Sequence, residues 1–519
     1  MIFLPVFQYA EIHYRFKYFF SYLKNNQPEI LFDAPHRIEP NKDLPLILFI
    51  KDAHLYPVEI ISVEFIVENN KQIQHYKYFI NEWINTQFWD KIFLIKFDKV
   101  FKKSLGWFNL KAVVNYSVNG KLQKCTIDNY KTSSKNNLKV YRSKYTLPKL
   151  QNSKCGDLHT HSNYTNDQVE FGLSLKSSAI LSQSIGLNFF CSTDHSYDLD
   201  DEEFNYLKND PLEIKWKKFL KEVFNFNRTN KNFKIIPGEE LSCLNKYGKN
   251  IHLLLINQKN LLTGSGDSAE KWFKTKSKYN IVEALKLKDP NSISIAAHPL
   301  ENVALLQKLL LNRDNWKEED LLNKNLNGFQ ILNGITNKSF FDGKKFWINQ
   351  LLQGRKTFIF AGTDAHGNFN RFRQLKIPFV TIVENSNQLF GSMRTVILNS
   401  SLKINDLIKN LKLGNCVITT GPLLHISKNQ NLKINCKVIS NPEFGNLQSL
   451  KIIIGNLDLK TESYIMNKIY DKSIFVNDIK NIKLPLNNKF YIRAELNTTN
   501  GEGLLSENIC FTNPIFYNY

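Results

Sequence analysis

Six histidines and a few acids between residues 150 and 420 have the residue types of a metal site. Each histidine lies at or near a short apolar run: His159, His161, His195, His252, His298 and His366. The accompanying acids are Asp194, Glu239, Glu240 and Asp364. Mixed imidazole and carboxylate ligands suit Zn, Mn or Fe, whereas all-oxygen ligand sets suit Mg or Ca. These residues therefore predict a site for divalent cations.

The spacing of the first two histidines supports this interpretation. His159 and His161 are two residues apart in the run GDLHTH, which predicts a strand. Side chains at this spacing in a strand point to the same face, so both imidazoles can bind one ion. A single histidine at a strand end is more often a hydrogen-bonded structural residue. The recurrence of histidine at five apolar runs favours metal binding instead.

The elements that must position these residues follow a repeated pattern from residue 156 to about residue 368. Seven apolar runs that predict strands alternate with segments whose apolar residues are three and four positions apart. The predicted helices are LSLKSSAILSQSIGL, EIKWKKFLKEVFNFN and NKSFFDGKKFWINQLL. Alternation of this kind predicts parallel strands in a closed or nearly closed α/β barrel, where the carboxyl ends of the strands meet at one face.

The regions on either side of this pattern have a different rhythm. Residues 1–150 contain short alternating runs such as VEIISVEFIV, separated by Asn, Lys, Asp and Gly turns. After Gly421 and Pro422 the chain again shows short β-like runs. We expect a β-rich, Ig-like sandwich over residues 1–150, the barrel over residues 151–420, and a C-terminal β-sandwich over residues 421–519.

Six ordered motifs resemble a known family. GDLHTHSNYTND, STDH, PGEELS, HLLL, AAHP and GTDAH resemble the polymerase-and-histidinol-phosphatase (PHP) superfamily over roughly residues 155–368. The segments LKLGNCVITTGPLL and FTNPIFY resemble the CehA/McbA-type metallohydrolases, a PHP subgroup. The resemblance implies a distorted seven-stranded βα barrel with two or three divalent ions per chain. Many relatives carry Glu at the position of Gln330, so we expect the support of the ligands to differ here.

The resemblance also implies how the ligands divide among the ions. The first set is His159, His161, Glu240 and Asp364. Glu240, rather than Glu239, is the expected bridge to a second ion that His252 and His298 also bind. His195 and His366 belong to a third set, completed by Asp167, or by Asn166 if the loop is one residue shorter. The implied catalytic residues are Asp194, His195 and Glu240, with Asp194 either orienting a ligand or exchanging protons with the leaving group.

The predicted chemistry is hydrolysis by a metal-bridged hydroxide. Coordination to an ion such as Zn lowers the pKa of water to about 7, and the metals also polarise the bond under attack. We rank phosphoester hydrolysis first. A carboxyl or carbamoyl ester, or an amide, is the alternative substrate at the same site. The alternative from another class is a non-catalytic binding protein with a PHP-like barrel, but such proteins tend to lose ligands, and here all six histidines are present.

The whole-chain properties set the remaining expectations. The net charge of +20 over 519 residues is compatible with nucleic acid, but the lysines are dispersed, so we expect a small-molecule ester substrate instead. Seven cysteines with no CxxC pair predict reduced thiols. The N-terminus is a poor signal peptide, and no uninterrupted apolar stretch has the length of a membrane span. We expect a cytoplasmic location; the oligomeric state is left open.

Overall fold

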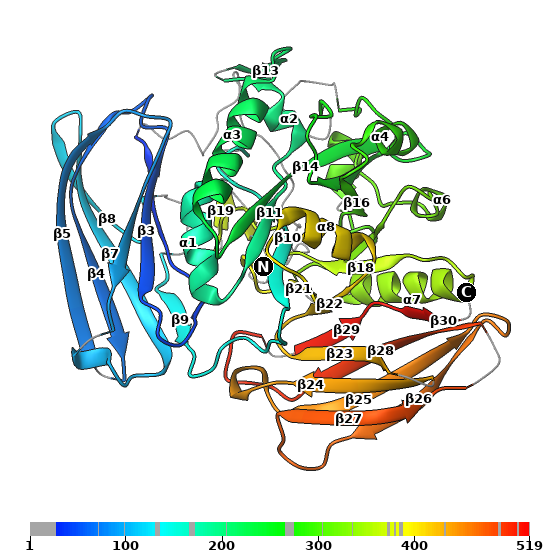
Figure 1. The fold of residues 1–519 in the computed structure, drawn as a ribbon. Coiled ribbons are helices and arrows are strands. Elements are labelled where there is room, and N and C mark those ends of the chain that lie inside the picture. Colours follow the sequence, from blue (N-terminus) through cyan, green and yellow to red (C-terminus); the bar gives the residue numbers. More distant parts are fainter. Residues whose placement is uncertain are drawn as a thin grey trace.

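The computed structural model describes most of the chain. The described residues are 27–517 without 71, 98, 130–134, 166–171, 204, 265–274, 304, 335, 371–373, 378–379, 384–387, 430–431, 486–488 and 506–507. Sheets dominate, and Figure 1 shows a central group of strands and helices, with the N-terminal strands (blue) on one side of it and the C-terminal strands (orange and red) on another. Within the described residues, no helix has the length and apolar character needed to cross a membrane.

The N-terminal region consists of two sheets that enclose one apolar core. One sheet has the order β1 (Glu29–Asp33), β3 (Leu44–Lys51) and β6 (Phe88–Ile95). The other has the order β2 (Arg37–Ile38), β9 (Leu138–Arg142), β7 (Gly106–Val118), β4 (Val58–Asn69) and β5 (Gln72–Ile84), with β8 (Lys121–Thr126) paired to β7. Alternation of buried and half-buried residues along β4 explains its single core-facing side.

Strand β3 differs from β4 because both of its faces are buried. Leu46 and Leu48 belong to the N-terminal core, whereas Ile47 and Phe49 pack into the core beneath helix α1 (Leu175–Ile185). Period-two alternation places these pairs on opposite faces of one strand. β3 therefore joins the N-terminal sheets to the central region by apolar packing.

The central region contains seven strands that are neighbours in one sheet. They are β10 (Lys154–Thr160), β11 (Phe189–Ser192), β14 (Lys234–Leu244), β15 (Asn250–Ile256), β16 (Ile293–Ala296), β17 (Gly328–Leu332) and β18 (Phe358–Ala361). The ends of this series approach each other, since Asp364 N donates to His159 O at 2.8 Å and His161 N donates to Ala365 O at 2.9 Å. The PHP-type barrel itself remains a prediction.

The expectation of an all-parallel series is wrong at one strand. β15 runs antiparallel to both β14 and β16, while the other neighbouring pairs in the series are parallel. The reason is the connection between β14 and β15, which spans only residues 245–249. A parallel crossover needs a dozen or more residues, so a link this short closes a hairpin.

The three helices expected from apolar spacing are confirmed as α1, α3 (Ile214–Thr229) and α7 (Lys338–Leu352). Ser174 caps α1 by accepting from Ser177 N, and Asn337 caps α7 by accepting from Phe340 N. Among the described residues, the other α-helices are α2 (Ser196–Leu199), α4 (Ile281–Leu287), α5 (Leu305–Leu310), α6 (Glu318–Leu321) and α8 (Ile404–Lys412). Two short ribbons pair β12 (Asp201–Glu202) with β13 (Asn205–Asn209), and β19 (Gln374–Ile377) with β20 (Val380–Val383).

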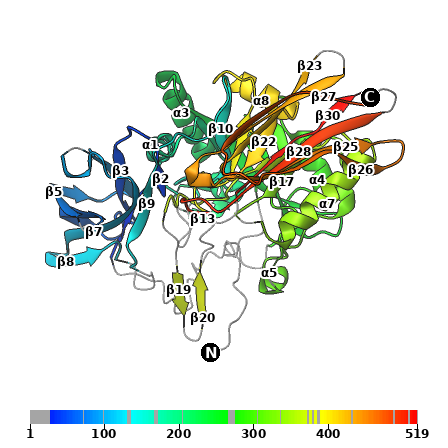
Figure 2. The same cartoon turned by 90° about the horizontal axis from the view of Figure 1, so that it is seen from below.

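Most of the described C-terminal strands continue the central sheet, and three others form a second sheet. From β10 the order proceeds through β21 (Arg394–Ile397), β22 (Cys416–Thr419), β29 (Asn508–Thr512), β28 (Phe490–Thr498), β25 (Leu447–Asn456) and β26 (Thr461–Ile469), with β30 (Ile515–Tyr517) paired to β28. A second sheet, β23 (Leu423–Asn429), β24 (Lys433–Ile439) and β27 (Val476–Lys483), shares an apolar core with these strands. Figure 2 shows both C-terminal sheets extending together from the central region. One hydrogen-bonded sheet therefore crosses residue 420.

Candidate metal centre

The end of β10 and the segment after β18 bring the first ligands together. His159 and His161 flank Thr160, and main-chain hydrogen bonds hold Asp364 beside them. A Cβ atom at Gly362 would lie 2.7 Å from the Cβ atom of His159, so glycine permits this close approach. Asp364 itself has a φ of 56°, a left-handed conformation that non-glycine residues rarely adopt. The backbone conformation at Gly362 and Asp364 therefore places the Asp364 carboxylate beside the His159 imidazole.

The first cluster consists of His159, His161, Glu240 and Asp364, which we call the middle group. Both Nε2 atoms lie 3.1 Å from Asp364 Oδ1, and they lie 3.2 and 3.3 Å from Glu240 Oε2. Ligand atoms about 2.1 Å from one ion are separated by about 3.0–3.4 Å at angles between 90° and 109°. These contacts therefore have the length of edges of a coordination polyhedron, and the cluster can hold a metal ion.

A second cluster, the outer group, consists of Glu240, His252 and His298. In the β14–β15 hairpin, Glu240 pairs with Leu254 and Ser242 pairs with His252, so Glu240 and His252 are diagonal neighbours on one face. Glu240 Oε1 lies 2.7 Å from His252 Nδ1 and 3.3 Å from His298 Nε2. Glu240 thus directs one oxygen to each group.

The third cluster, the inner group, consists of three buried histidines: His161, His195 and His366. The rings of His161 and His366 are stacked, with centroids 4.0 Å apart and planes inclined by 3°. His366 Nδ1 donates to Asp364 O at 3.0 Å, which leaves Nε2 as its ligand atom. Asp167, expected to complete this set, and the alternative Asn166 lie outside the described residues.

Polar partners orient two histidines of the middle group. Gln330 Nε2 donates to Gly362 O, which identifies its Oε1 atom as the acceptor 2.9 Å from His159 Nδ1. His159 therefore carries its proton on Nδ1 and presents the Nε2 lone pair to the cluster. Gln330 thus supplies an acceptor at the position where many relatives of the resembled family carry Glu.

A hydroxyl and a carboxylate orient the other histidine. Thr165 Oγ1 donates to Asp194 and accepts from His161 Nδ1 at 3.2 Å. Asp194 also accepts from the backbone amides of Ser162 and Thr165 and from the hydroxyl of Ser192. Asp194 joins none of the three groups among the described residues. Through these hydrogen bonds, Asp194 holds the loop that follows His161.

The geometry distinguishes the two adjacent glutamates of β14. Glu240 belongs to two groups, whereas Glu239 accepts from Ser196 Oγ at 2.7 Å and from Leu262 N at 3.1 Å. Burial raises the pKa of Glu239 to about 8. Burial would also raise the pKa of Glu240, but His252 and His159 hold it well below its usual range. The two carboxyl groups therefore have opposite electrostatic environments.

The pKa values of the histidines are also shifted in opposite directions. Burial lowers the pKa of His161, but the Asp364 and Glu240 carboxylates reverse this effect and raise it to about 10. Burial and the neighbouring His161 hold the pKa values of His195 and His366 well below normal. In the metal-free protein, protons therefore concentrate in the middle group, where a cation would replace them.

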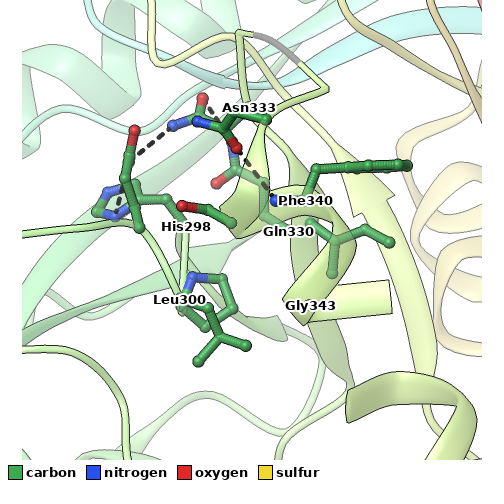
Figure 3. A pocket seen from close by; sticks show the side chains of 11 residues that line it. His298, Leu300, Gln330, Asn333, Phe340 and Gly343 are labelled. Carbon is green, nitrogen blue, oxygen red and sulfur yellow. Dashed lines mark hydrogen bonds and ion pairs between the residues drawn. The ribbon is translucent and has the colours of Figure 1, made fainter. Parts of the chain in front are cut away.

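The centre opens to solvent on the side of the outer group. The side chains of His298 and Asp364 are 15% and 18% exposed, whereas that of Glu240 is fully buried. His298 and Gln330 line a hollow of about 310 Å³, which also contains Glu301, Asn333 and Phe340 (Figure 3). Solvent therefore reaches the metal centre beside His298 and Asp364. His298 has a φ of 28°, a second strained backbone position at the site.

Besides Thr165, three polar residues of the site were not expected from the sequence. Arg313 Nη2 lies 2.9 Å from both ring nitrogens of His252. Glu301 Oε2 lies 3.7 Å from His298 Nδ1 and accepts from Asn333. Asp157 accepts from Thr363 and from the backbone amides of His159 and Gly391. Only Asp157 had a usable signal, since it lies two residues before His159 in the same strand.

Comparisons with known proteins do not assign this chain to a family. No protein-family model matches the chain, and no curated protein matches it. Two of the solved structures compared are a β-glucuronidase from Bacteroides uniformis (8% identity, TM-score 0.17) and an FMN-binding β-glucuronidase from Facaelibacterium prausnitzii L2-6 (11% identity, TM-score 0.17). The alignments cover 93% and 89% of this chain, and 60% and 71% of those chains. Similarity this low does not indicate a shared fold.

Proposed function

We propose that the chain is a metal-dependent hydrolase of PHP type that cleaves phosphoesters. The observation that carries this proposal is the division of the Glu240 carboxylate, with Oε1 facing His252 and His298 and Oε2 facing the histidines of the middle group. A carboxylate in this position can bridge two ions about 3.5–4 Å apart, the separation of two-metal hydrolases. Zn, Mn and Fe are the ions that this donor set fits.

Bound ions of this kind supply a nucleophilic water at neutral pH and polarise the bond that breaks. The chain itself supplies the positioning. Gln330 and Thr165 hold two imidazoles with their Nε2 atoms toward the middle group, and Asp194 fixes the loop after His161. The hydrogen bonds that Asp194 already accepts favour a positioning role over proton exchange with the leaving group. His195, also expected to be catalytic, fits better as a ligand of the inner group.

Arg313 favours a phosphoester over an uncharged ester. Its guanidinium lies beside His252, which belongs to the outer group. Arg313 and the bound ions would place positive charge on the same side of the centre, which attracts an anionic group. Arginine binds the oxygens of phosphate through a planar set of N–H donors, and a carboxyl or carbamoyl ester offers no comparable charge. The phosphate group of a substrate would therefore be attracted by both the arginine and the ions.

The test combines metal analysis with a substrate screen. Purified protein should contain Zn, Mn or Fe and should hydrolyse a phosphomonoester or phosphodiester faster than an aryl carboxyl ester or an aryl carbamate. Replacing Arg313 by Ala should raise KM for the phosphoester while metal content stays unchanged. Faster cleavage of the uncharged esters would select the alternative substrate class. Full metal content without hydrolysis of any of these substrates would select the binding protein.

A further inference from the structure

A second and larger hollow lies between α7 and the C-terminal sheet. It measures about 1210 Å³ and is lined by the start of α7 and by strands β25, β28 and β29. Phe340, in the first turn of α7, lines both this hollow and the smaller one beside His298. Figure 1 shows α7 along the C-terminal strands. The larger hollow, which we call the α7 groove, is therefore adjacent to the open side of the metal centre.

The α7 groove is lined by side-chain amides and by an exposed aromatic ring. Gln448, Asn497 and Asn500 line it, and their side-chain amides are exposed and make no hydrogen bond to the described part of the chain. Each amide offers both donors and an acceptor, which matches the hydroxyl groups of a sugar. Phe341 lines the same groove and is 57% exposed, so its ring can pack against the apolar face of a sugar ring.

Other ligand classes fit less well. An extended peptide binds by adding to a sheet edge, but β25, β28 and β29 each have a paired strand on both sides. Among the described lining residues, Lys344 and Lys451 are the cations, and Lys344 Nζ lies 2.7 Å from Glu495 Oε2. Arg493 pairs with the other oxygen of Glu495. With one of its two lysines neutralised, the groove lacks the positive charge that tracks a nucleic-acid backbone.

We propose that the α7 groove is a carbohydrate-binding site, with Phe341 as the stacking surface and the three amides as hydrogen-bonding partners. The groove is separate from the ligand clusters, so this binding does not depend on metal. The two hollows share Phe340, so an oligosaccharide in the α7 groove would lie next to the side of the metal centre that carries His298. If the proposed hydrolysis is also correct, the substrates best suited to the whole surface are phosphoesters of sugars.

The test is calorimetric titration of the full chain with maltohexaose, cellohexaose, xylohexaose and chitohexaose. At least one should bind, and Phe341→Ala and Asn497→Ala should each weaken that binding about tenfold. Phe224→Ala is the matched control, because Phe224 lies on α3 and is 66% exposed outside the groove. Glu240→Gln should leave oligosaccharide binding unchanged, which separates this proposal from the metal chemistry. Binding of none of the four, or equal binding by Phe341→Ala, Asn497→Ala and wild type, would overturn it.

Discussion

The middle and outer groups share a carboxylate, whereas the middle and inner groups share an imidazole. Glu240 has two oxygens and directs one to each of its groups. His161 has one ring nitrogen available, because its Nδ1 atom is hydrogen-bonded to Thr165. A carboxylate can bridge two ions, but a neutral imidazole with one lone pair can bind only one.

This difference ranks the three clusters. The middle and outer groups have the geometry of a bridged pair of ions, and the outer group also lies on the open side of the centre. If His161 serves the middle group, the inner group keeps two histidines, His195 and His366, among the described residues, and Glu240 Oε2 lies 3.2 Å from His195 Nδ1. We therefore expect two firmly bound ions per chain, with a third ion bound more weakly or absent.

Replacing Glu240 should have the largest effect. Glu240→Gln preserves the volume but removes the negative charge that offsets two neighbouring ions. At least one metal per chain should be lost, and turnover should fall by at least about a hundredfold, the upper range for partners that only orient ligands. Elemental analysis and kinetics provide the measurement. Glu239→Gln is the matched control and should retain metal and activity; the opposite pattern would show that Glu239 is the bridge.

Single histidines should then separate the bridged pair from the inner group. His252→Ala should release about one ion and reduce turnover roughly a hundredfold, whereas His366→Ala should leave the bridged pair loaded and cost less than about tenfold. Metal content after dialysis against a weak chelator distinguishes these results. Equal loss from both variants would mean that the inner group is as important as the outer one.

The orienting amide should have a smaller effect. Gln330→Leu removes the acceptor of the His159 Nδ1 proton, so metal affinity should fall about tenfold, the lower range for such partners. Gln330→Glu restores an acceptor and should recover the affinity. Competition titration with a fluorescent chelator gives the affinities, and Gln353→Leu, at an exposed residue after α7, is the control. Unchanged metal affinity in Gln330→Leu would show that Gln330 does not orient His159 for metal binding.

The smallest effect concerns the pH dependence of the metal-free protein. The pKa of His161 is raised from 6.5 to about 10, so its stabilising contribution is complete below pH 6.5 and is lost as pH rises toward 10. The lowered pKa values of His195 and His366 act oppositely and reduce stability as pH falls below 6.5. Melting in EDTA should therefore show an alkaline decline that His161→Gln reduces and His366→Gln does not. An alkaline decline of the same size in His161→Gln would contradict this assignment.

The sequence predicted the site better than the sheet around it. Histidines and acids that follow apolar runs can be recognised because strand ends converge, and eight of the nine expected metal ligands lie in the three clusters, with Asp167 outside the described residues. The alternating pattern favoured parallel strands throughout, whereas the link between β14 and β15, residues 245–249, is too short for a parallel crossover. The pairing of β22 with β29 joins residues about ninety positions apart, and no local pattern specifies such a partner.

The unexpected site residues have a similar explanation. Arg313 lies far from every motif and reaches His252 only because residue 313 bridges to Asn250 in the folded chain. Thr165 acts through one hydrogen bond to an imidazole nitrogen, as does Gln330, whose position the family resemblance had already indicated. Such bonds depend on rotamers that the sequence does not encode locally. Ligand types could be predicted from residue chemistry, whereas their partners required the tertiary structure.

Anomalous diffraction from crystals of the metal-loaded protein tests the central claim most directly. A bridged pair of ions should give two strong peaks about 3.5–4 Å apart, one on each side of the Glu240 carboxylate, with His159, His161 and Asp364 around one and His252 and His298 around the other. Any third peak, near His195 and His366, should be weaker. A single peak, or peaks that do not contact Glu240, would contradict the bridged pair.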